Sequence, residues 1–192
     1  MNIKSSLNDI TTHRISELEN MLLEISKSKK NIHIHSNSFF NRILFFASNF
    51  STKQLDIDNC RFPTICEIFN ASYKEVWIRE SNDIYYLERA YLHIYNITSE
   101  YTNIREDGEY LLLHSDPNIP ITDKHYKCKA GPHIHFQFSP EPISHSHWAL
   151  SLDSIDNILS DRLTFNSSFK NAIYQLRTQL FEPFDDYLLN QL

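Results

Sequence analysis

KEVWIRE (residues 74–80) and DIYYLERAYLHIYNIT (residues 83–98) decide the fold, because both segments are rich in β-branched and aromatic side chains. From residue 74 onward the hydrophobic pattern has a period of two, which is typical of a strand with one buried face. The polar stretch ESND (residues 80–83) supplies a turn between the two segments. Together they predict an antiparallel hairpin.

Two further segments extend this hairpin into a sheet. EYLLLHSD (residues 109–116) follows the turn REDG (residues 105–108), and HIHFQF (residues 133–138) comes next along the chain. Short connections favour antiparallel pairing, since parallel strands need a longer crossover. The irregular stretch of residues 116–132 is long for an ordinary loop, and such loops are typically functional.

The whole chain of 192 residues predicts a single α+β domain. Residues 1–72 are expected to be mainly helical, beginning with an amphipathic helix. Residues 73–150 form an antiparallel meander sheet that carries a histidine-rich segment. Residues 151–192 are expected to form two C-terminal helices.

Composition and charge exclude several classes of function. The net charge is −6, from 18 basic and 24 acidic residues, so no global positive field attracts nucleic acid. Gly108 and Gly131 are the two glycines, which excludes the glycine-rich motifs of nucleotide cofactor sites. Three cysteines argue against a disulfide framework. The first residues do not resemble a secretory signal and the apolar runs are short, so we expect a cytoplasmic protein without a membrane partner.

Six of the ten histidines lie between positions 114 and 147. Alternation along a strand puts His133 and His135 on one face, and it does the same for His145 and His147 if that segment is extended. Imidazoles with a carboxylate are ligands for a divalent metal such as zinc or manganese. The candidate ligands are His114, Asp116, His133 and His135.

This cluster leads to a functional hypothesis, a metal-dependent hydrolase or nuclease-like enzyme acting on a phosphate ester. His135, His145 and His147 are the candidate catalytic residues, because a histidine with a pKa near neutrality transfers protons well. Lys127 and Lys129 in the long loop would bind the anionic, phosphate-containing substrate.

A structural reading of the histidines stands beside this hypothesis, because strand histidines often hydrogen-bond at a sheet edge. His33 and His35 repeat the same spacing, and the sequence leaves open whether they join the cluster. The alternative function is a non-enzymatic interaction subunit or antitoxin-like partner of a bacterial defence or toxin–antitoxin system. Its acidic charge and aromatic faces would contact a protein partner or a second copy of the chain.

Two resemblances rest on the histidine segment. HIHFQF (residues 133–138) resembles the histidine-triad signature in the transferase branch that has glutamine in third place. That resemblance implies His135 as a nucleophile toward a nucleotide phosphate, oriented by His133 and Gln137. The chain departs from the family in having Ser139 at the last apolar position and little glycine before the motif.

A second resemblance covers roughly residues 75–180. The series LLLHSDP, GPHIHFQF and ISHSHWAL, followed by a helix, resembles small uncharacterised bacterial proteins with PHxHh…AHxPL segments. Some of these are encoded near defence or toxin–antitoxin loci. The resemblance implies a bacterial defence context and no particular mechanism.

Overall fold

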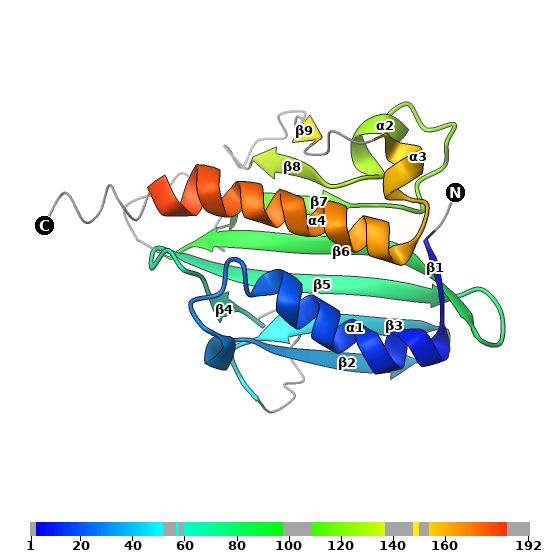
Figure 1. Cartoon of the computed structure of the whole chain (residues 1–192), viewed down its shortest axis with the longest axis horizontal. Coiled ribbons are helices and arrows are strands. Elements are labelled where there is room, and N and C mark those ends of the chain that lie inside the picture. The colour runs from blue at the N-terminus through cyan, green and yellow to red at the C-terminus, as the bar shows by residue number, and fades with distance from the viewer. Residues whose placement is uncertain are drawn as a thin grey trace, which may run out of the picture.

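The computed structural model describes residues 3–51, 57, 60–97, 109–136, 148–149 and 154–183. Its main feature is a broad antiparallel sheet with the helices α1 (Leu7–Leu22) and α4 (Arg162–Leu176) lying across one face (Figure 1). The predicted α+β class, with an N-terminal helix and C-terminal helices around an antiparallel sheet, is therefore confirmed.

The sheet has the order β2–β3–β5–β6–β7–β8–β9, and every pairing is antiparallel. Its strands are β1 (Lys4–Ser6), β2 (His33–Phe39), β3 (Arg42–Ser48), β4 (Phe62–Pro63), β5 (Phe69–Arg79), β6 (Ile84–Asn96), β7 (Glu109–Ser115), β8 (His133–Phe136) and β9 (Trp148–Ala149). The short β1 pairs with β6 and β4 pairs with β5. The strands β5 to β8 follow one another in sequence and in space, which is the predicted meander.

The expectation that residues 1–72 are mainly helical is wrong beyond the first helix. Residues 33–48 form the hairpin β2–β3, which adds two strands to one edge of the meander. In β3 the side chains from Phe45 to Ser48 are all buried, so its apolar run is continuous and carries no period of two. A short apolar run of this kind is compatible with a buried strand or a helix.

Polar side chains cap the main helices. The Ser6 side chain accepts a hydrogen bond from the Asp9 N–H at the start of α1, and Asp161 accepts one from the Thr164 N–H at the start of α4. After α4 the chain continues into a π-helical segment, η3 (Arg177–Phe181). The described residues also include the short elements η1 (Lys29–Asn31), α2 (Tyr126–Lys129) and α3 (Ile155–Ile158).

The core lies between the two long helices and the sheet. Tyr73 of β5 meets Phe169 of α4 edge to face, with ring centroids 6.1 Å apart, and both side chains are fully buried. Trp77 on β5 and Phe165 on α4 are buried in the same way, and burying one large apolar side chain contributes roughly 1.5–3 kcal/mol. In the described ranges, no helix combines the length and the apolar character needed to cross a bilayer.

Candidate metal centre

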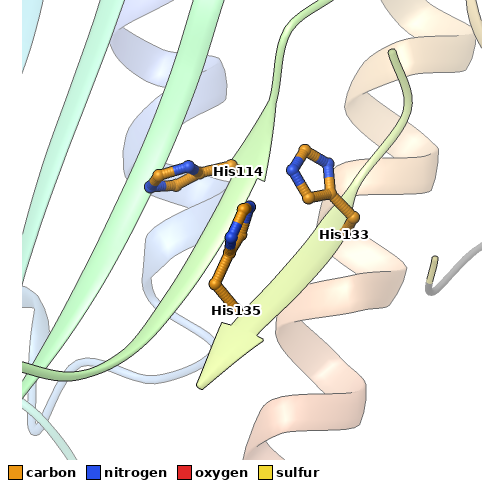
Figure 2. Close-up of side chains that lie close together, drawn as sticks. All are labelled: His114, His133 and His135. Carbon is orange, nitrogen blue, oxygen red and sulfur yellow. The ribbon is translucent and has the colours of Figure 1, made fainter. Parts of the chain in front are cut away.

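Three imidazoles lie together on β7 and β8: His114, His133 and His135 (Figure 2). The strand register explains the grouping, because His114 is directly opposite His133 and Leu112 is opposite His135. One ligand nitrogen from each of the three residues lies within 4.8 Å of the others. Among the described residues these three histidines form the group able to hold a metal ion.

The histidine cluster is largely shielded from solvent. His133 is fully buried, His135 is 7% exposed, and the rings of these two residues have centroids 4.7 Å apart. Ligands about 2.1 Å from a tetrahedral zinc lie roughly 3.4 Å from one another. Small side-chain rotations would therefore bring the three nitrogens close enough together to bind one zinc ion.

A backbone carbonyl orients His133. Its Nδ1 lies 2.9 Å from the carbonyl oxygen of Gly131, which can only accept a hydrogen bond. Nδ1 therefore carries the proton, and Nε2 is the nitrogen with a lone pair for a metal. A hydrogen bond to a backbone carbonyl is a usual way in which proteins fix the tautomer of a ligand histidine.

An aromatic ring orients His114. Tyr91 of β6 stacks on it, with ring centroids 4.0 Å apart and an angle of 23° between the planes. The Tyr91 hydroxyl donates to Oδ1 of Asp116 at 2.8 Å. Burial and, after it, the Asp116 carboxylate raise the pKa of Tyr91, so the hydroxyl keeps its proton. Asp116, a predicted ligand, is outside the converging group and holds this tyrosine in place.

Sequence reasoning missed His93 and Glu109, which extend the cluster across β6. His93 Nε2 is 3.3 Å from His114 Nε2, and His93 Nδ1 is 2.6 Å from Oε1 of Glu109. An irregularity between Ile94 and Tyr95 shifts the β6–β7 register, so that Tyr95 pairs with Glu109. Period-two alternation cannot locate such a bulge, and the sequence carries no other signal for the pair.

The other predicted site residues are placed as follows. Lys127 and Lys129 lie on α2, where the Lys129 carbonyl accepts from the Asp116 N–H at 2.9 Å and thereby brings α2 beside the end of β7. His145 and His147 are outside the described residues. His33 and His35 lie on β2, separated from β7 by three strands, so they do not join the cluster.

Three cationic side chains lie near the aromatic residues of β6. The guanidinium carbon of Arg89 is 5.7 Å from the centre of the Tyr91 ring, and that of Arg61 is 3.7 Å from the centre of the Tyr95 ring. Lys74 on β5 is directly opposite Tyr91. The carboxylates of Glu88, Glu109 and Asp116 lie in the same region, so it holds charges of both signs.

Comparisons of this chain with protein-family models, with curated proteins and with solved structures find no match. The arrangement of the site's own residues therefore carries the functional argument.

Proposed function

We propose that the protein is a metal-dependent hydrolase that acts on a phosphate ester, with zinc held by His114, His133 and His135. The observation that carries the proposal is the convergence of three imidazole nitrogens within 4.8 Å on two adjacent strands. Three histidines form a ligand set typical of catalytic zinc, because they leave a fourth position for water. A set made of imidazoles favours zinc over manganese, which prefers oxygen ligands.

The chemistry of such a site is hydrolytic. A zinc ion in a three-histidine site lowers the pKa of bound water to about 7 and so supplies a hydroxide at neutral pH. The chain itself contributes a largely buried site, since His133 is fully buried and His135 nearly so. His145 and His147, immediately before β9, are the proposed groups for proton transfer to the leaving oxygen.

A phosphate ester is the proposed substrate class because the surroundings suit an anion. Arg61, Lys74 and Arg89 lie around the aromatic residues of β6, next to the histidines. Lys127 and Lys129 on α2 add two further cations beside the end of β7. Cations near a binding site raise the local concentration of an anionic substrate.

Metal content and hydrolysis test this proposal together. The metal content of protein purified without a histidine tag is measured by inductively coupled plasma mass spectrometry. Hydrolysis is assayed with p-nitrophenyl phosphate and bis(p-nitrophenyl) phosphate. We expect close to one zinc per chain and metal-dependent release of p-nitrophenol, both abolished in the His133→Ala/His135→Ala variant. The matched control is His33→Ala/His35→Ala, which removes the same spacing of histidines from β2 and should retain metal and activity.

A protein that takes up no metal would overturn the proposal. The second candidate, a non-enzymatic interaction subunit such as an antitoxin-like partner, would then be favoured. One observation supports that candidate: Phe39 and Phe40 at the β2–β3 turn are both exposed, and Phe40 has a positive φ of 32°. Contiguous exposed apolar side chains, here two adjacent phenylalanines, are a feature of protein contact surfaces.

A further inference from the structure

We propose that Glu109 is a positioning residue that acts through His93 to fix the tautomer of His114. In this arrangement His114 offers Nδ1 to the metal, whereas His133 offers Nε2. The inference rests on the proposed metal centre for its functional meaning, but the tautomers that it assigns can be measured without metal. It gives a role to the buried Glu109 and the partly buried His93, which the three-histidine set does not use.

The first step is the hydrogen bond between Glu109 and His93. Oε1 of Glu109 lies 2.6 Å from His93 Nδ1, and the Glu109 residue is 4% exposed. A carboxylate oxygen accepts hydrogen bonds, so this geometry assigns the shared proton to His93 Nδ1. The Tyr95 hydroxyl is 3.5 Å from the same nitrogen, a longer and weaker contact. In a neutral imidazole protonated on Nδ1, Nε2 is the acceptor.

In the second step, the position of the proton on His93 determines which nitrogen of His114 carries a proton. Its Nε2 lies 3.3 Å from His93 Nε2, and two imidazole nitrogens can share a hydrogen bond only if one of them carries the proton. Because His93 Nε2 accepts, His114 Nε2 must donate. The remaining nitrogen of His114, Nδ1, then has the lone pair that a metal requires.

The third step is the ring orientation that makes this tautomer useful. The stacked Tyr91 ring fixes the plane of His114 between β6 and β8, with His93 toward β6 and the other ligands toward β8. The ring centroid of His135 is 4.9 Å from that of His114 on the β8 side. At metal sites a carboxylate commonly orients a ligand histidine by a direct hydrogen bond, and here a second imidazole stands between the two groups.

The tautomers can be read directly by ¹⁵N-edited NMR of the imidazole rings. We expect the full-length protein, before any metal is added, to carry the proton of His93 on Nδ1 and that of His114 on Nε2. After zinc is added, the Nδ1 resonance of His114 should shift while its Nε2 stays protonated. Opposite tautomers in the metal-free protein, or zinc on Nε2 of His114, would overturn the inference.

Variants of Glu109 separate positioning from mere support of the fold. Glu109→Leu removes the acceptor and should weaken zinc binding by about 10–100-fold, with the proton redistributed over both nitrogens of His93. Glu109→Gln keeps an acceptor oxygen and should restore both the tautomer and most of the affinity. Ser48→Ala, which removes a buried hydroxyl from β3 on the far side of β5 from His93, is the matched control and should change neither.

Failure of this inference is distinguishable from failure of the proposed function. If the wild-type protein binds no zinc, the proposed metal centre is overturned, and the metal-free spectra still decide the tautomers. If zinc binds equally well to the wild type and to a folded Glu109→Leu variant, the metal centre stands and the positioning role of Glu109 is overturned.

Discussion

Arg14 of α1 and Glu75 of β5 form a fully buried ion pair in the layer between the helices and the sheet. The Arg14 Nε donates to Glu75 Oε1 at 2.7 Å, and the Tyr73 hydroxyl donates to Glu75 Oε2 at 2.6 Å. Burial opposes the charge of Arg14, but the Glu75 carboxylate outweighs it and raises the pKa of the guanidinium. Burial and then Glu75 raise the pKa of Tyr73 well above its ordinary value. This network holds α1 against the sheet face opposite the histidines.

Glu75→Gln is expected to lower the free energy of unfolding by about 3–5 kcal/mol, because it leaves the buried Arg14 guanidinium with only the partly exposed Glu17 as counter-charge. Urea denaturation at pH 7 measures the change. Glu80→Gln, which removes the carboxylate of the exposed pair with Lys4, is the control and should cost at most about 1 kcal/mol. Similar losses for the two variants would contradict the structural role assigned to the buried pair.

Zinc is expected to stabilise the folded protein through the histidine cluster. A ligand at 100 times its dissociation constant that binds only the folded state adds about 2.7 kcal/mol to the free energy of unfolding. Urea denaturation with zinc and with a chelator should show this difference for the wild type. The difference should disappear in His114→Ala and persist in His13→Ala, which changes an exposed histidine on α1. An unchanged midpoint with and without zinc in the wild type would speak against the site.

Gly131→Ala is expected to strain the segment that orients His133. A Cβ at this position would lie 3.1 Å from Cδ1 of Ile155 and 3.4 Å from Cδ1 of Ile158, and overpacking of this kind typically costs about 1–3 kcal/mol. Ile155→Val removes the nearer methyl group and should recover part of the loss. A double-mutant cycle by chemical denaturation measures the coupling, and additive effects would contradict the predicted clash.

The cap of α4 is expected to make stability sensitive to acid. The backbone N–H of Thr164 and then its hydroxyl lower the pKa of Asp161 below the ordinary value of 3.8. The carboxylate's contribution is therefore complete above pH 3.8 and is lost as the pH falls through the lower folded value. Asp161→Ala should cost about 0.5–2 kcal/mol at pH 7, and less as the carboxyl group protonates.

Denaturation at pH 7, 5 and 3 measures this dependence. Asp161→Asn is the control, because an amide caps the helix without titrating. The difference in free energy of unfolding between the wild type and Asp161→Ala should become smaller at pH 3. The difference between Asp161→Asn and Asp161→Ala should stay constant. If the difference between the wild type and Asp161→Ala also stayed constant with pH, the cap assigned to Asp161 would be contradicted.

The parts of the fold that follow local rules could be predicted from the sequence. The strands β5 and β6 could be predicted because their alternation is long and their turn is polar. The hairpin β2–β3 was missed because β3 is buried on both faces over Phe45 to Ser48, which removes the period that distinguishes a strand. Its position beside β5 depends on tertiary pairing, for which the sequence offers no local signal.

Some residues of the candidate site could also be predicted from the sequence, and others could not. That His133 and His135 share a face follows from strand geometry, and both are in the cluster. His114 could be predicted from its position at the end of the preceding strand. Asp116, which was also predicted as a ligand, lies outside the group of three histidines, and its Oδ1 accepts from the Tyr91 hydroxyl. His93 and Glu109 could not be paired, because their contact depends on a bulge and on the order of the strands.

The placement of the three histidines on β7 and β8 has a mechanical consequence. These strands are joined by the long connection of residues 116–132, and β8 pairs over four positions with β7 and over two with the short β9. An ion bound by His114 from one side and by His133 and His135 from the other would act as a cross-link between the strands. Amide hydrogens of β8 would then exchange with solvent more slowly in the zinc-loaded protein, while those of β2 and β3 kept their rates.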